Sequence, residues 1–177
     1  MSKKDAGYEK KGLLVSKGGY YKSYIADISV CGYEKILVLG YESLKLVKHL
    51  HKKCLTGNIT VTGLSDEEAL AASKKFVLKN RIEVSKNTMS SMVDAERSFD
   101  IIILHLNYND LDMEPDLKVL KLLLNHAGTI FVRERSLSFD MEDMETAIEN
   151  ENLSLIKWSQ TNTNPFGDVY DLKIRHK

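Results

Sequence analysis

The chain has 177 residues, of which 43% are hydrophobic and 28% charged, and its formal net charge is zero. This composition suits one domain with its own core, and no apolar run approaches the roughly 20 residues of a membrane-spanning helix. Two prolines and ten glycines leave no room for a long disordered linker.

Charge is distributed unevenly along the chain. Residues 1–60 hold 11 lysines and 5 acidic side chains, a net charge of +6, and the remainder carries −6. Residues 1–18 are predicted to form a flexible basic segment, followed by one α/β domain over residues 19–177. The N-terminal lysines are either solvated or contact phosphates. No apolar run follows Met1, so no secretory signal is expected and the predicted location is cytoplasmic.

The cysteines and histidines do not suggest a metal site. Cys31 and Cys54 lack the spacing of a ligand pair and are interpreted as packed thiols in a reducing compartment. The five histidines are scattered along the chain. We therefore expect no bound metal.

Helical and extended patterns alternate over the first half of the chain. Apolar residues recur at helical spacing over residues 19–31, and Gly32 is the predicted stop of that helix. Buried strands are predicted over residues 36–39 and 59–62, with a helix over residues 43–54 between them. A capping box follows the second strand and predicts another helix. The capping residues are Ser65 to Glu68, and the expected inner face is Ala69, Leu70, Ser73, Phe76 and Val77.

The second half continues the alternation and then breaks it. Further strands are predicted over residues 82–85, 99–104 and 129–132, the second of them central because it is the most apolar. Helices are predicted over residues 116–126 and after Asp140. Two strands, residues 154–158 and 169–174, then follow without a helix between them, so we expect an antiparallel pair. Trp158 is expected to pack under the last helix.

These elements predict an α/β fold with three layers. The sheet is doubly wound and has about seven strands, mostly parallel, with an antiparallel C-terminal hairpin strand. Sheets of this kind bind ligands at the carboxyl ends of their strands.

Over residues 19–177 the chain resembles the class I S-adenosylmethionine-dependent methyltransferase family. Residues 59–70 are similar to the family's second strand and following helix. Ser98-Phe99-Asp100, followed by four apolar residues, is similar to its fourth strand. Residues 120–132 are similar to the helix and glycine turn before its fifth strand, and the C-terminal hairpin matches the family's antiparallel last strand.

The cofactor motifs of that family are degenerate here. Gly40 fits the first glycine of the turn after the first strand, but Glu42 stands in place of the second glycine and Val38 in place of an acid. An acid at the end of the second strand is represented by Ser65 or Asp66, and an adenine-binding Asp by Asn87 or Thr88. The resemblance implies that Gly40, Glu42, Ser65, Asp66, Asn87 and Thr88 line an S-adenosylmethionine site. Each lost charge-assisted hydrogen bond costs roughly 1.5–3 kcal/mol of binding free energy.

The end of the fourth strand faces the methyl acceptor in this family. His105 there is a candidate general base, and Asn107 with Tyr108 are candidates for orienting a substrate amine. The alternative interpretation is a polar loop that leaves a buried strand. The three charges of Arg133-Glu134-Arg135 fit either recognition of an anion or a surface ion-pair cluster.

Three hypotheses of function remain open. The first is an S-adenosylmethionine-dependent methyltransferase of unknown acceptor. The second is a non-catalytic relative, a scaffold or subunit with a decayed cofactor pocket that binds a protein partner. The third is a nucleic-acid-binding protein that uses the basic N-terminal segment, whose binding would weaken with added salt. No membrane partner is expected, and the oligomeric state does not follow from the sequence.

Overall fold

The computed structural model describes residues 28–40, 44–107, 113–136, 140–162 and 168–177. The chain divides into two units, residues 1–30 and 31–177, and the fold described below is that of the second unit. The predicted boundary between residues 18 and 19 lies outside the described residues. In the described part of the chain, no helix combines the length and apolar character that crossing a membrane requires.

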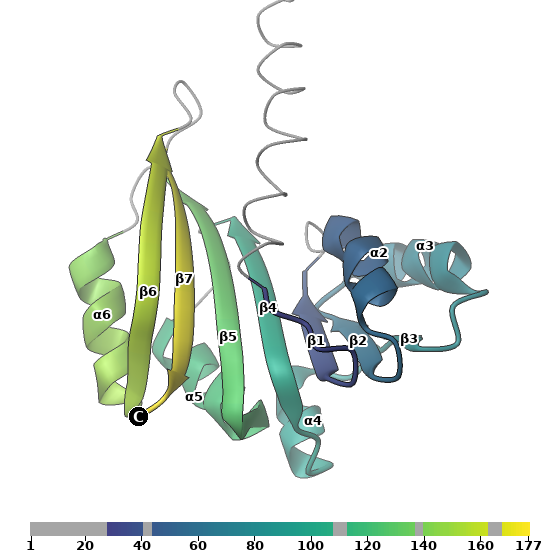
Figure 1. Ribbon diagram of the computed structural model, residues 1–177, viewed down its shortest axis with the longest axis horizontal. Coiled ribbons are helices and arrows are strands. Elements are labelled where there is room, and N and C mark those ends of the chain that lie inside the picture. Colours follow the sequence, from purple (N-terminus) through teal and green to yellow (C-terminus); the bar gives the residue numbers. More distant parts are fainter. Residues whose placement is uncertain (1–27, 41–43, 108–112, 137–139, 163–167) are drawn as a thin grey trace, which may run out of the picture. The chain divides into compact units, whose positions relative to one another are not determined.

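Seven strands form one sheet, which confirms the predicted number, and their order is β3-β2-β1-β4-β5-β7-β6 (Figure 1). The first five strands are parallel, and β7 runs antiparallel between β5 and β6. β4 is the central strand. The elements are β1 (Lys35–Leu39), α2 (Leu44–Lys53), β2 (Asn58–Thr62), α3 (Asp66–Phe76), β3 (Ile82–Val84), α4 (Met89–Asp94), β4 (Phe99–Asn107), α5 (Met113–Leu123), β5 (Leu124–Ser136), α6 (Met141–Asn150), β6 (Leu153–Asn162) and β7 (Asp168–His176).

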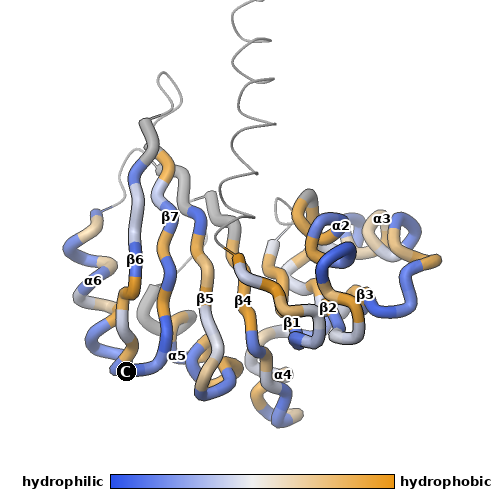
Figure 2. The backbone as a smooth tube through the Cα atoms, in the orientation of Figure 1, coloured by the Kyte–Doolittle hydropathy of each residue, from blue (hydrophilic) through white to orange (hydrophobic). Residues whose placement is uncertain are grey.

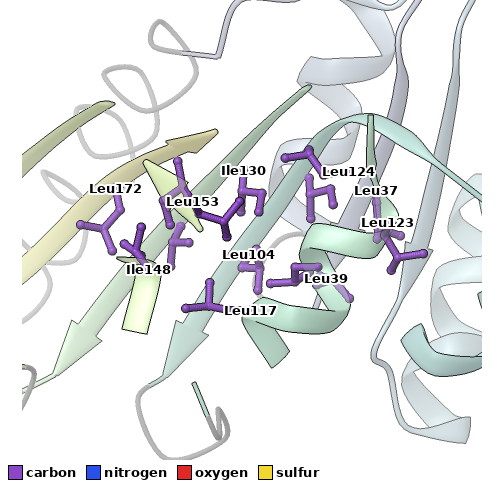
Figure 3. Packing of buried hydrophobic residues seen from close by; sticks show 14 of the residues in the cluster. Leu37, Leu39, Leu104, Leu117, Leu123, Leu124, Ile130, Ile148, Leu153 and Leu172 are labelled. Carbon is purple, nitrogen blue, oxygen red and sulfur yellow. The ribbon is translucent and has the colours of Figure 1, made fainter. Parts of the chain in front are cut away.

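Helices cover the sheet on both faces, because successive strand residues point to opposite sides and both sides are apolar. On one face, the helices α4, α5 and α6 bury alternate residues of the central strands (Figure 3). Ile36, Val38, Ile59 and Val61 belong to the opposite face and are buried. Seven apolar residues of α2 and α3 are buried as well: Leu44, Leu46, Val47, Leu50, Ala69, Ala72 and Phe76. Figure 2 shows hydrophobic colour concentrated along β1 and β4 and hydrophilic colour along α6. The core on the face covered by α4, α5 and α6 includes Leu37, Leu39, Met92, Ile102, Leu104, Leu117, Leu120, Ile130, Val132, Met144 and Ile148.

Two helices differ from their predictions. In α3 the buried residues are Ala69, Ala72 and Phe76, which share one helix face, whereas Leu70 and Val77 are exposed. The helix predicted over residues 116–126 begins earlier and ends at Leu123, where β5 starts. Leu117, Leu120 and Leu123 point inward as expected, whereas Leu122 is exposed.

The segment before β1 is held by Glu34 and is not helical. The buried Glu34 carboxylate accepts the backbone N–H groups of Cys31 at 2.5 Å and Gly32 at 2.9 Å. Residues 28–31 lie outside any helix, so the predicted helix over residues 19–31 is wrong at its C-terminal end. Burial opposes ionisation of Glu34, but the backbone hydrogen bonds outweigh it, and the pKa is lowered from its ordinary value.

Glu34→Gln is expected to lower the free energy of unfolding by about 1–2 kcal/mol at neutral pH, because a charged acceptor is lost. A pKa lowered in the folded state gives stability that is present above the unfolded value of 4.5 and is lost as the pH falls through the folded value. The difference between wild type and variant should therefore shrink in acid. Urea unfolding at neutral and acidic pH measures it, with exposed Glu67→Gln as the control. A difference independent of pH would contradict this prediction.

Candidate functional site

The candidate site lies where the strand order changes direction. Chain order runs from β1 outward to β3 on one side and from β4 outward on the other. In open α/β sheets, the crevice at the carboxyl ends of the strands beside this switch point binds ligands. β1 ends here at Leu39, directly before Gly40, and β4 ends here at Asn107.

Two left-handed glycines meet at the ends of β1 and β2. Gly40 has φ +82° and Gly63 has φ +70°, a region that side chains beyond glycine rarely adopt. The Gly40 amide donates to the Thr62 carbonyl at 3.1 Å. A Cβ on Gly63 would lie 3.4 Å from the Gly40 nitrogen. The two turns therefore leave bare backbone at this edge.

Thr62 connects the segment after β3 to the end of β2, beside the two glycines. Its side chain is buried, and its hydroxyl donates to the Asn87 carbonyl at 2.5 Å. The Asn87 amide in turn donates to the Ser85 hydroxyl at 3.1 Å. These bonds hold the segment that carries Asn87 against β2, beside the two glycines.

Ser65 and Thr88 begin the helices that follow these strands. The Ser65 hydroxyl accepts the Glu68 amide at 3.3 Å, and the Glu68 carboxylate accepts the Ser65 amide at 2.9 Å, which completes the predicted capping box. Thr88 accepts the Ser91 amide at 3.2 Å and caps α4 in the same way. Both hydroxyls therefore satisfy helix N-termini, as such residues commonly do.

Asp66 forms an exposed ion pair with Lys86. The two charged groups are 2.8 Å apart, and their side chains are 91% and 73% exposed. The hydrogen bond from Lys86 and its positive charge lower the pKa of Asp66. Exposed pairs exchange readily with water and ligands because they contribute little free energy. The Asp66 carboxylate is therefore accessible at this edge.

Comparisons with known proteins identify the architecture. No protein-family model matches the sequence, and a search of curated proteins gives no match. Among solved structures, a TehB-like S-adenosylmethionine-dependent methyltransferase from Corynebacterium glutamicum has a TM-score of 0.68 at 16% identity, covering 98% of this chain and 97% of that one. An S-adenosylmethionine-dependent methyltransferase from Clostridium acetobutylicum has a TM-score of 0.68 at 14% identity, with coverages of 96% and 98%. A ribosomal protein L11 methylase from Lactobacillus delbrueckii subsp. bulgaricus has a TM-score of 0.62 at 21% identity, with coverages of 82% and 71%.

The chain has the class I methyltransferase fold. Identities this low establish the fold and leave the activity to be argued from residues. In this methyltransferase fold, the edge described above unites Gly40, Ser65, Asp66, Asn87 and Thr88 from three successive β–α turns. Glu42 lies outside the described residues.

Two of the residues predicted to act on a methyl acceptor lie at the end of β4. His105 and Asn107 are its closing residues and pair in register with Arg133 and Arg135 of β5. Tyr108 lies outside the described residues. The roles predicted for these three residues remain predictions.

Arg133 is buried rather than part of a surface cluster. Its guanidinium donates through Nε and Nη2 to the two carboxylate oxygens of Asp171, which lies directly opposite on β7. The two side chains are 3% and 17% exposed. Arg133 therefore joins β5 to β7, and this ion pair is structural.

A second polar group lies at the opposite, amino-terminal edge of the sheet. There Arg97 donates to Glu83 at 2.8 and 3.1 Å and to the Thr60 hydroxyl at 3.0 Å, beside a cavity of about 510 Å³. The hydrogen bond from Arg97 is the main cause that lowers the pKa of Glu83. Because these groups satisfy one another, the network is interpreted as structural.

Three residues of the carboxyl edge were not predicted from the sequence: Thr62, Gly63 and Lys86. A glycine directly after a predicted strand is a signal that could have revealed Gly63. No comparable signal marks Thr62 or Lys86, because their partners lie 25 and 20 residues away. Within the described residues, no three His, Cys, Asp or Glu side chains gather as a metal site would require.

Proposed function

We propose that this protein binds S-adenosylmethionine at the carboxyl edge of β1, β2 and β3 and transfers a methyl group to an acceptor. One observation carries the proposal. Gly40 and Gly63 adjoin at the switch point with left-handed backbones, and the solved structures with the same fold include S-adenosylmethionine-dependent methyltransferases. A ligand can approach bare backbone where a Cβ would stand in its way.

The residues of this edge fit the cofactor in part. The two glycines admit its amino-acid end, the Asp66 carboxylate is proposed to accept from the ribose hydroxyls, and Asn87 and Thr88 are proposed to lie beside the adenine. Asp66 must then exchange its bond with Lys86. Ser65 and Glu42 complete the proposed lining. Binding through these degenerate motifs is expected to be weak, because Val38 is a buried apolar residue where related proteins carry an acid.

When bound, S-adenosylmethionine supplies a methyl group on a positively charged sulfur that a nucleophile can attack. The protein contributes mainly by holding the acceptor in line, so few dedicated groups are needed. His105, at the end of the strand beside β1, is proposed as the base that removes the acceptor's proton. Asn107 and Tyr108 are proposed to orient an acceptor amine. The acceptor itself is not assigned.

Location and partners are part of the same proposal. Both cysteines are free thiols, which suits a reducing compartment and supports a cytoplasmic location. The non-catalytic alternative, with a protein partner, predicts no binding of the cofactor. The nucleic-acid alternative predicts binding through residues 1–18 that weakens steeply with salt.

Gly40→Ala tests the proposal. The substitution forces the left-handed turn to move or strain by about 1–2 kcal/mol, so the dissociation constant for S-adenosylmethionine should rise about tenfold. Isothermal titration calorimetry on the full chain measures it. Gly32→Ala is the matched control, because Gly32 also has a positive φ, +113°, but lies before β1. The affinity of this variant for S-adenosylmethionine should equal that of wild type. Absence of heat with the wild-type protein at high concentration would refute cofactor binding.

A further inference from the structure

A groove of about 430 Å³ lies at the far edge of the sheet, between α6 and β6. Figure 1 shows the two elements side by side at the side of the sheet remote from β1 to β3. Ile148 of α6 and Leu155 and Trp158 of β6 provide its apolar lining, and Glu145 and Glu149 provide carboxylates. The groove is distinct from the proposed cofactor site and does not depend on it.

A β-bulge places Trp158 on the side of β6 that faces α6. Leu155 pairs with Ile174 and Trp158 pairs with Leu172, with the register shifted between Leu155 and Lys157. Ile174 and Leu172 belong to the core under α6. Without Ile156, the extra residue of the bulge, the alternation of side chains along β6 would place Trp158 on the other face of the sheet. The Trp158 side chain lies on the predicted face of β6, the one that faces α6, but it is still 46% exposed.

The carboxylates above this tryptophan have no cationic partner in the described part of the chain. Glu145 and Glu149 are one helical turn apart and exposed, and neither forms a salt bridge with another described residue. All four charged residues of α6 are acidic. Two lysines, Lys157 and Lys177, also belong to the lining of the groove. Lys157 pairs in register with Lys173, on the face of β6 opposite to Trp158.

We propose that this α6–β6 groove binds an extended basic segment of a partner protein. A Lys or Arg side chain would lay its aliphatic stem on the partly buried Leu155 and its charged end over Trp158, within reach of the carboxylates of Glu145 and Glu149. Tryptophan is the preferred aromatic partner of such cations, and the carboxylates add charge complementarity. A second copy of this chain is a poor occupant, because it would bring two acidic α6 helices together.

The single tryptophan of the chain makes the binding directly measurable. Titration with octalysine should change the Trp158 fluorescence saturably, and octaglutamate should not. The double variant Glu145→Gln/Glu149→Gln should weaken octalysine binding about tenfold, since two charge contacts are removed. The matched control is Glu142→Gln/Asp143→Asn, which removes two charges of α6 outside the groove and should change affinity less than about twofold.

The role of the ring is tested separately with a labelled peptide. In fluorescence anisotropy with labelled octalysine, Trp158→Leu should weaken binding about fivefold, because the cation–π contact is lost and the apolar contact kept. Equal losses in the two charge variants would overturn the proposal, since they would indicate attraction to the whole helix. If the Trp158 fluorescence changes with protein concentration and sedimentation velocity shows a dimer, the groove binds a second copy of this chain. That result would also overturn the proposal. No saturable response to octalysine would also overturn it.

Discussion

Asp171→Asn is expected to lower the free energy of unfolding by about 3 kcal/mol, because it leaves the Arg133 guanidinium buried and charged beside a neutral amide. Arg133 and Asp171 lie directly opposite each other on β5 and β7, and both carboxylate oxygens accept from the guanidinium. Asparagine keeps the shape of the side chain, so the loss reports the charge. Urea unfolding followed by circular dichroism measures it.

Two further variants make this result interpretable. Asp66→Asn breaks the exposed pair with Lys86 and should leave stability nearly unchanged, since water replaces the lost contact. The double variant Arg133→Met/Asp171→Leu removes both buried charges and should recover most of the loss, as apolar replacement of a buried pair commonly does. A double variant less stable than Asp171→Asn would show that the ion pair itself, rather than the loss of one carboxylate charge beside Arg133, determines the effect.

Gly57→Ala is expected to destabilise the protein by about 3 kcal/mol or more, because there is no space for a methyl group. A Cβ at Gly57 would lie 2.0 Å from the carbonyl oxygen of Glu34 and 2.6 Å from the carbonyl carbon of Tyr33. These are backbone atoms, so no side chain can move aside. The same Glu34 oxygen accepts the Asn58 amide at 3.2 Å, and a shift would weaken the join between β1 and β2.

Gly32→Ala provides the comparison for this prediction. A Cβ at Gly32 meets its nearest atom at 3.5 Å, an ordinary contact, so only the positive φ of +113° is costly. We expect a loss of about 1 kcal/mol from that strain alone. Thermal unfolding of both variants measures the difference. A loss at Gly57 no larger than that at Gly32 would mean that the turn yields, and would contradict the argument from space.

Local patterns in the sequence predicted most elements of this fold. The capping box at Ser65 and the cap at Asp140 use contacts within three residues, so the sequence contains both partners at known spacing. The buried run after Phe99 predicted the central strand for the same reason. α4 was missed because it spans only six residues, Met89–Asp94, which is too short for a helical period to stand out.

The candidate site was less predictable than the fold. The sequence indicated Gly40, Ser65, Asp66, Asn87 and Thr88, and these residues do follow the ends of neighbouring strands. It predicted the cap at Ser65 but did not reveal that Thr88 caps α4 or that Lys86 pairs with Asp66. Each hydroxyl or carboxylate can accept several donors, and only the folded chain determines which donor is near.

The sequence by itself determined the order in which most strands and helices follow one another along the chain, because hydrophobic periodicity and caps act over one or two turns of chain. Tertiary structure alone decided which distant residues meet: Gly40 with Gly63, and Arg133 with Asp171. These meetings depend on strand register, and a single bulge at Ile156 reverses the face to which the following residues point. Register is set by pairing between strands far apart in the chain, which no local pattern encodes.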